Sequence, residues 1–105
     1  MKLPRFSGKP KRLSPLILRR VTGQSMSPTL REGKIIFART FYGELNPHDI
    51  VIVNHGGIEK IKRIQKITAE HVYIVGDNPA QSTDSREFGW IARDRVSAKL
   101  LWPSR

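Results

Sequence analysis

The sequence predicts a small all-β domain of short antiparallel strands with little helix, and three observations lead to this fold class. The chain has 105 residues, which is room for one domain with one small core. Short apolar runs rich in β-branched and aromatic residues recur along it, separated by glycine, proline and asparagine. Hydrophobic residues make up 38% of the chain and cysteine is absent, so the core must be held without disulfides.

Residues 1–20 differ in composition from the rest of the chain. They contain seven Lys or Arg and no Asp or Glu, whereas the remaining residues carry twelve basic and nine acidic side chains. We therefore expect a basic, flexible N-terminal segment at 1–20 and a folded domain at 21–105, with ordered structure beginning near Leu16 or Val21. Such a segment can make peripheral contact with acidic lipid. We expect no nucleic acid partner, because Phe6 is the only aromatic residue before Phe37.

No stretch of this chain is long enough to cross a membrane. The basic segment offers only the short apolar run Leu16-Ile17-Leu18, whereas a spanning helix needs about 20 mostly apolar residues. A secretory leader would need a longer apolar centre and a small-residue cleavage site. We expect a cytoplasmic or peripherally membrane-associated protein.

The ordered elements can be assigned in chain order. Residues 27–33 predict a single helical turn, with Ser27 as cap, Pro28 at the first helical position and Gly33 at the end. Short apolar runs at 34–39 and 49–54 predict two strands joined by a loop. Further strands are expected at His71–Val75 and Val96–Trp102.

The run Ile58–Ile67 is ambiguous. Its isoleucines recur every third residue, at 58, 61, 64 and 67, which favours a helix face. The β-branched composition, the Gly56-Gly57 entry and the neighbouring strands favour a strand instead. We predict a strand in which a β-bulge between Ile61 and Ile64 shifts the alternation.

Three motifs carry the chemical information. Read singly, each is an ordinary turn or charged surface. The first covers residues 23–30 and reads Gly-Gln-Ser-Met-Ser-Pro-Thr-Leu, and the second is the pair Lys62-Arg63. The third begins with Gly-Asp-Asn at 76–78 and continues with Ser82, Asp84, Ser85, Arg86 and Gly89.

Together, these motifs resemble the type I signal peptidase family in residue type, order and spacing. The resemblance runs from Val21 to the C-terminus. The third motif is especially similar to that of short members that act as nickel-type superoxide dismutase maturation proteases. Typical signal peptidases are tethered to the membrane, and this chain has no comparable anchor. We therefore leave open whether general signal peptides or one dedicated precursor is cut.

The resemblance implies a serine endopeptidase that removes an N-terminal leader from a protein substrate. Ser25 would be the nucleophile and Lys62 the general base, with Ser82 orienting the lysine amine. A serine hydroxyl needs a neighbouring base to become nucleophilic. An ordinary lysine titrates at about 10.4, so burial must lower the pKa of Lys62 before it can act as that base. By resemblance, the substrate carries small residues before the cut.

The remaining motif residues are assigned to support. We expect the Ser25 N–H to stabilise the oxyanion, with Gly23 and Gln24 in the same turn and the second donor unassigned. Arg63 and Asp77 are expected to pair as a salt bridge. The other supporting residues are Met26, Pro28, Asn78, Asp84 and Arg86. No metal or cofactor is expected.

Two other readings compete with this one. A histidine-based hydrolase would have to use His48, His55 or His71, which lie in turns or at a strand start and lack the spacing of a metal site. A basic membrane-surface or nucleic-acid-binding module on a catalytically inactive peptidase fold is the alternative function. A self-cleaving repressor is disfavoured, because about 20 residues cannot hold a DNA-binding domain.

Overall fold

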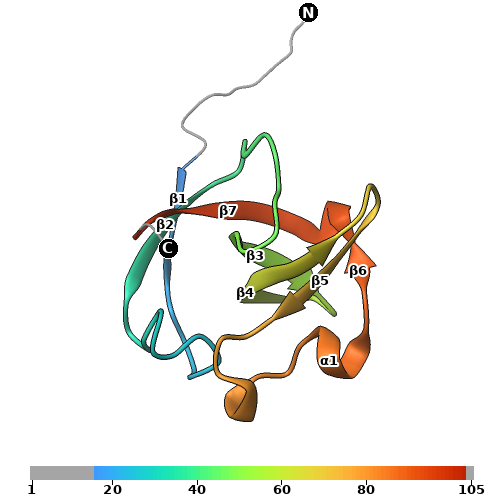
Figure 1. The fold of residues 1–105 in the computed structure, drawn as a ribbon. Helices are drawn as coiled ribbons and strands as arrows, with labels where there is room; N and C mark the ends of the chain where they lie inside the picture. The colour runs from blue at the N-terminus through green and yellow to red at the C-terminus, as the bar shows by residue number, and fades with distance from the viewer. Residues whose placement is uncertain (1–15, 104–105) are drawn as a thin grey trace, which may run out of the picture.

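A computed structural model describes residues 16–103, which form a seven-stranded antiparallel sheet (Figure 1). The strand order is β1-β2-β7-β3-β4-β5-β6. The strands are β1 (Leu16–Arg20), β2 (Ile35–Arg39), β3 (Ile50–His55), β4 (Ile58–Ile67), β5 (His71–Val75), β6 (Ile91–Ala92) and β7 (Val96–Trp102). The helical elements are η1 (Pro79–Gln81), α1 (Ser85–Phe88) and η2 (Arg93–Arg95), and none of these is long enough to span a membrane. The predicted all-β class is confirmed.

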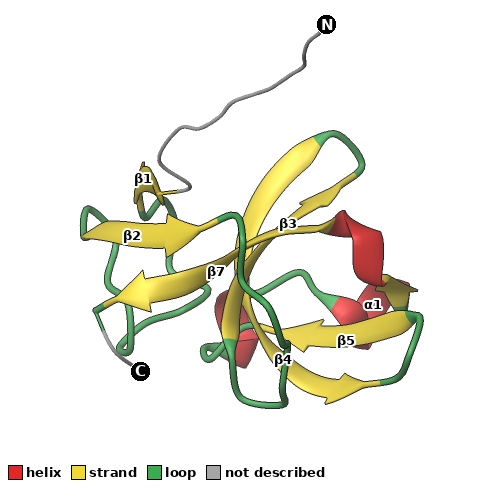
Figure 2. Cartoon of the chain, turned by 90° about the horizontal axis from the view of Figure 1, so that it is seen from above, coloured by secondary structure: helices red, strands yellow, loops and turns green. Residues whose placement is uncertain are grey.

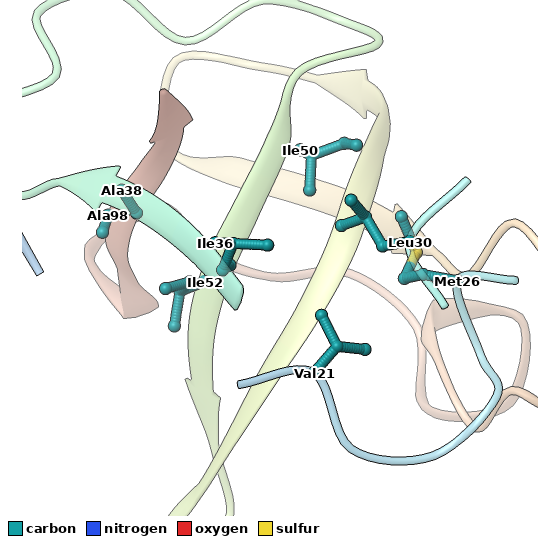
Figure 3. Packing of buried hydrophobic residues seen from close by; sticks show 8 residues of the cluster. All are labelled: Val21, Met26, Leu30, Ile36, Ala38, Ile50, Ile52 and Ala98. Atoms are coloured by element: carbon teal, nitrogen blue, oxygen red, sulfur yellow. The ribbon is translucent and has the colours of Figure 1, made fainter. Parts of the chain in front are cut away.

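The sheet is strongly curled (Figure 2), and its central strand β3 is buried on both faces. Ile50 and Ile52 belong to the first core cluster, shown in Figure 3, whereas Val51 and Val53 belong to a second cluster on the opposite face. This arrangement explains the isoleucine spacing of β4, which lies next to β3. A strand beside a doubly buried neighbour can place apolar residues on both of its faces.

The prediction that β4 is a strand is confirmed, but the position of its irregularity is wrong. Ile61 packs against the first cluster and Ile64 belongs to the second, so they lie on opposite faces without a bulge between them. The register shifts instead between Ile64 and Lys66, in the pairing with β5. This shift returns Ile67 to the face of Ile64, and Ile67 packs against the second cluster.

The sheet begins within the segment that the sequence analysis set apart as residues 1–20. All five residues of β1 pair with β2, and Ile17 packs against the first core cluster. The strand itself was not predicted, but it begins at Leu16, which is one of the two expected starts of ordered structure. The charges of Arg19 and Arg20 obscured it, because only one face of this edge strand contacts the core. The rest of the basic segment, residues 1–15, lies outside the described residues.

Residues 27–33 do not form the predicted helical turn. The turn lies slightly earlier, where the Leu30 N–H donates to the Met26 carbonyl at 2.8 Å, and Pro28 is exposed. Met26 and Leu30 are fully buried in the first cluster (Figure 3), so burial of these two side chains sets the conformation of the loop. The sequence analysis also missed α1, which Asp84 caps by accepting a hydrogen bond from the Arg86 N–H at 3.1 Å.

Candidate active site

Lys62 is a buried lysine on β4. It pairs in register with Val51 of β3, lies on the same face as Ile64, and its side chain is only 5% exposed. Its Nζ donates a hydrogen bond to Ser82 Oγ at 3.1 Å. Burial lowers the pKa of Lys62 below its ordinary value, and this effect outweighs the opposing negative charge of Asp84. A larger fraction of Lys62 is therefore neutral near neutral pH than of an exposed lysine.

Ser82 and Asp84 continue this hydrogen-bonded chain. The Ser82 hydroxyl donates to Asp84 Oδ2 at 2.5 Å, and the Asp84 carboxylate also accepts hydrogen bonds from the Gly76 N–H at 2.7 Å and from Arg86 Nη2 at 2.6 Å. Burial raises the pKa of Asp84, but the hydrogen bonds from Arg86, Ser82 and Gly76 outweigh it and hold the pKa well below its usual range. Asp84 is thus ionised, and it accepts a hydrogen bond from the Ser82 hydroxyl. The Ser82 lone pairs then face Lys62.

Ser25 lies in the loop between β1 and β2. Asn78 of the Gly-Asp-Asn turn holds this loop in place through two hydrogen bonds. The Asn78 N–H donates to the Ser25 carbonyl at 2.8 Å, and Asn78 Nδ2 donates to the Gln24 carbonyl at 3.1 Å. Within residues 16–103, nothing accepts a hydrogen bond from the Ser25 N–H or from its hydroxyl. Both groups are therefore available to a substrate.

Ser25 and Lys62 line the same cavity, which has a volume of about 270 Å³. In the part of the chain that the structure describes, no hydrogen bond joins the two side chains. Catalytic hydrogen bonds in ligand-free enzymes are often long and tighten when substrate binds. The shared cavity places a hydroxyl and a lysine of lowered pKa beside one binding space.

Gly76 is essential to this arrangement, and its role was not recognised in the sequence. A Cβ atom at this position would clash with Ser82 Oγ and would lie 2.7 Å from the Ser25 carbonyl oxygen. Both the Ser25 loop and the Ser82 side chain therefore approach the backbone of one residue. The only sequence signal was the glycine that opens the third motif, because close backbone approach requires glycine.

We expect Gly76→Ala to lower kcat by about 100-fold, because a displacement of about 1 Å at a reacting group has an effect of this size. The added methyl group must push the Ser25 backbone and the Ser82 hydroxyl apart. Gly57→Ala is the control for a destabilising glycine substitution away from the site, since its φ of 77° strains the alanine backbone although nothing lies within 4 Å of a Cβ atom there. Steady-state kinetics on both variants, with circular dichroism to verify folding, measure the effect. Equal activities would contradict this role of Gly76.

The other predicted residues surround this core of the site. Arg63 and Asp77 form two hydrogen bonds, of 2.9 and 2.7 Å, which connect β4 to the Gly-Asp-Asn turn. Arg86 Nη2 donates to the Gly76 carbonyl at 3.1 Å, so it braces the same turn. Met26 is buried beneath the Ser25 loop and lines the cavity.

Gln24 does not point its side chain at the candidate oxyanion position. Its carboxamide donates to Glu32 at 3.3 Å and accepts from the Ser27 hydroxyl at 3.1 Å. Gly23 has a φ of 78°, a conformation that glycine adopts at little cost, so its observed role is in the turn. The Ser25 N–H has both a free hydrogen and a position on the cavity wall, as an oxyanion donor requires.

The three histidines lie elsewhere. His48 and His71 are exposed, and His55 stacks on the ring of Phe88 with centroids 4.0 Å apart. None of them lines the cavity. Across residues 16–103, no group of three His, Cys, Asp or Glu side chains is arranged to hold a metal ion.

Several cavity residues were not anticipated from the sequence. They come from β1 and the two residues after it, from the first half of β4 and from the third motif, and they have no motif of their own: Arg19, Arg20, Val21, Thr22, Glu59, Lys60 and Thr83. Ile61, which the sequence suggested as part of the apolar surroundings of Lys62, lines the cavity as well. These residues are brought together because the sheet curls so that β1 faces β4. Arg19 and Glu59 form an ion pair across this gap, with Nε and Oε1 2.6 Å apart.

Comparison with known proteins agrees with this geometry. A search of curated proteins found no match to the chain. A family model described as Peptidase S24-like matches residues 4–93, which include every residue of the candidate site. That family lies in the superfamily that also includes the type I signal peptidases, so the match agrees with the wider resemblance and does not distinguish between subgroups. The chain belongs to the Peptidase S24-like family of peptidases.

Proposed function

We propose that this protein is a serine endopeptidase in which Ser25 and Lys62 form a catalytic dyad that removes an N-terminal leader from a protein substrate. The observation that carries the proposal is the buried Lys62, whose pKa is lowered and whose amine bonds Ser82 beside the cavity that Ser25 lines. A lysine so placed reduces stability and gains no ion pair within the described residues. Catalysis is the function that accounts for it.

The proposed reaction follows from the positions of these groups. Neutral Lys62 removes the Ser25 hydroxyl proton as Oγ attacks the scissile carbonyl carbon. The Ser25 N–H stabilises the oxyanion, and one such donor is worth about 3 kcal/mol in comparable enzymes. The tetrahedral intermediate collapses with loss of the new N-terminal amine, which takes the proton from Lys62. Water, deprotonated by Lys62, then hydrolyses the acyl-enzyme and restores Ser25.

The substrate is proposed to bind as an extended strand beside the sheet. β1 is the first strand of the sheet, and β4 pairs with β5 only from Arg63 onwards within residues 16–103. The cavity thus lies between β1 at Arg19 and Arg20 and the part of β4 before Arg63, and an extended peptide can add its own backbone hydrogen bonds to these strand edges. This binding mode suits the segment around a leader cleavage site, which must be extended to reach Ser25.

The more specific assignment of the substrate rests on the sequence motifs. Similarity to nickel-type superoxide dismutase maturation proteases supports a dedicated precursor as the substrate. The expected peripheral contact with acidic lipid also stays a prediction; Leu18, Phe37 and Trp102, which are exposed and adjacent on β1, β2 and β7, support it. The alternative of a binding module on an inactive fold leaves the Lys62–Ser82–Asp84 chain without a role.

The direct test is cleavage of a synthetic leader peptide with small residues at the first and third positions before the bond. Wild-type protein should cleave it, and Ser25→Ala provides the blank. Because the pKa of Lys62 is lowered and the neutral amine is the base, the rate should rise with pH through an apparent pKa below the ordinary lysine value of 10.5. A rate that rises only near 10.5, or activity that survives in Ser25→Ala, would refute the dyad.

A further inference from the structure

The cavity has an unequal charge distribution. Apart from the candidate base Lys62, three basic residues line it, Arg19, Arg20 and Lys60, against the single acidic residue Glu59. A cleft lined mainly by one sign of charge concentrates ligands of the opposite sign. The groove beside the candidate dyad is therefore suited to a peptide that carries negative charge.

The charges are not spread evenly along the groove. Arg19 and Glu59 form an ion pair with each other. Arg19 is two residues from Ile17 and Glu59 is two residues from Ile61, and both isoleucines pack against the first core cluster. Lys62 lies three residues after Glu59 on β4, which is about 10 Å along a strand. An extended peptide in the groove thus reaches the Arg19–Glu59 pair three to four residues from its scissile bond.

The geometry and exposure of the Arg19–Glu59 ion pair allow Arg19 to bind a different carboxylate. Its hydrogen bonds, from Nε at 2.6 Å and from Nη2 at 3.2 Å, use the planar fork of the guanidinium, which fits any carboxylate. The side chains are 42% and 40% exposed, and exposed ion pairs contribute little net stability. Both strands contact the core or their neighbours independently of it. A carboxylate of a bound peptide can therefore replace Glu59 on Arg19.

We propose that Arg19 is a specificity-determining residue that binds an acidic side chain of the substrate three to four residues from the scissile bond, in exchange for Glu59. This inference rests on the proposed function and names its substrate class, a leader region with an acidic residue at that distance. A lysine at the same position would face Arg19, Arg20 and Lys60 and would be rejected. The released Glu59 remains next to Lys60 on β4.

The test uses a neutral parent peptide in which a single Glu is moved one position at a time, from four residues before the bond to four residues after it. Gln and Lys replace Glu at each position as references. We expect one position, three or four residues from the bond, at which Glu raises kcat/KM roughly 10-fold over Gln and Lys lowers it. Fluorescence anisotropy of the same peptides with Ser25→Ala protein measures binding without cleavage.

Variants separate Arg19 from the general positive charge. Arg19→Gln should remove the Glu preference, and Glu59→Gln should strengthen it, because the internal competitor is gone. Arg95→Gln is the control, since it removes the same charge from an exposed site outside the cavity. The proposal is overturned if no position prefers Glu, if Arg19→Gln keeps the preference, or if Arg95→Gln loses it equally.

The two proposals can fail separately. If wild-type protein cleaves the neutral peptide without any dependence on Glu, the charge selectivity is wrong and the peptidase assignment stands. If Ser25→Ala protein binds Glu peptides in a position-dependent and Arg19-dependent manner while wild-type protein cleaves none of them, the selectivity stands and the peptidase assignment is wrong. Absence of both binding and cleavage overturns both.

Discussion

Lys62→Met should abolish peptide cleavage and, at the same time, stabilise the protein. Loss of a general base costs up to about 10⁴-fold in rate, and residues that act as a unit with a nucleophile can cost more. Stability should rise because methionine fills a site that is 5% exposed without the cost of burying a charge.

Thermal and urea denaturation beside steady-state kinetics measure both effects, and the pH dependence of stability adds a second test. Because the pKa of Lys62 is lowered in the folded state, the unfolded chain binds more protons between that pKa and 10.5. The free energy of unfolding of the wild type should therefore rise with pH across this window. In Lys62→Met this rise should disappear.

Lys66→Met is the matched control for this prediction. Lys66 lies on the same strand but is exposed, with its Nζ 4.9 Å from the ring centroid of Tyr73. This variant should keep activity and gain no stability. A Lys62→Met protein that cleaves normally, or that loses stability, would show that Lys62 is a structural residue.

Asp84→Asn should have the largest effect on stability. The carboxylate is 1% exposed and accepts hydrogen bonds from Gly76, Ser82 and Arg86, and asparagine cannot satisfy these donors with its single oxygen. Leaving a buried donor without its acceptor costs about 1 to 3 kcal/mol for each group. The ion pair with Arg86, whose side chain is 38% exposed, is lost as well. The free energy of unfolding of a small domain is only roughly 5 to 15 kcal/mol, so the variant should be severely destabilised.

The pH dependence of this loss has a defined direction. The pKa of Asp84 is depressed in the folded state, so its contribution is complete above the unfolded value of 3.8 and is lost as the pH falls from there towards the folded pKa. The difference in stability between wild type and Asp84→Asn should therefore shrink below about pH 4. Asp94→Asn, at an exposed aspartate, is the control and should be neutral.

Asp84→Asn also has a kinetic signature that instability alone would not produce. The negative charge of Asp84 raises the pKa of Lys62, so removing it should lower that pKa further. The acidic limb of the pH–rate profile should move to lower pH, while kcat falls because Ser82 no longer holds the lysine amine. An unchanged acidic limb in folded variant protein would contradict the coupling of Asp84 to Lys62.

Part of the fold follows from local sequence. The apolar runs that form β2, β3, β5 and β7 were predicted within one residue of their observed bounds, because alternation and β-branched composition are local properties. β4 was predicted despite its helical spacing, since composition outweighed periodicity. β1 and β6 were missed: the first contains two arginines and the second has two residues, so neither carries a readable pattern.

Part of the site also follows from the sequence. The motif residues Ser25, Lys62 and Ser82 could be assigned by resemblance, and the structure places them around one cavity and one hydrogen-bonded chain. Asn78 was assigned only to support, whereas the structure shows that it holds the Ser25 loop by two hydrogen bonds. The residue type at that position was readable, but its partners 53 and 54 residues away were not.

The sequence by itself determined the strand-forming segments and the turn-forming glycines, since each of these depends on neighbours in the chain. It also supplied the residue types of the proposed dyad, through the motifs that carry the family resemblance. Only the tertiary structure decided which distant groups meet. The curl of the sheet brings Arg19 of β1 to Glu59 of β4, and the packing of Gly76 leaves no space for a side chain between Ser25 and Ser82. The tertiary structure also decided the pKa of Lys62, because burial among distant segments lowers this pKa and no local sequence pattern encodes such burial.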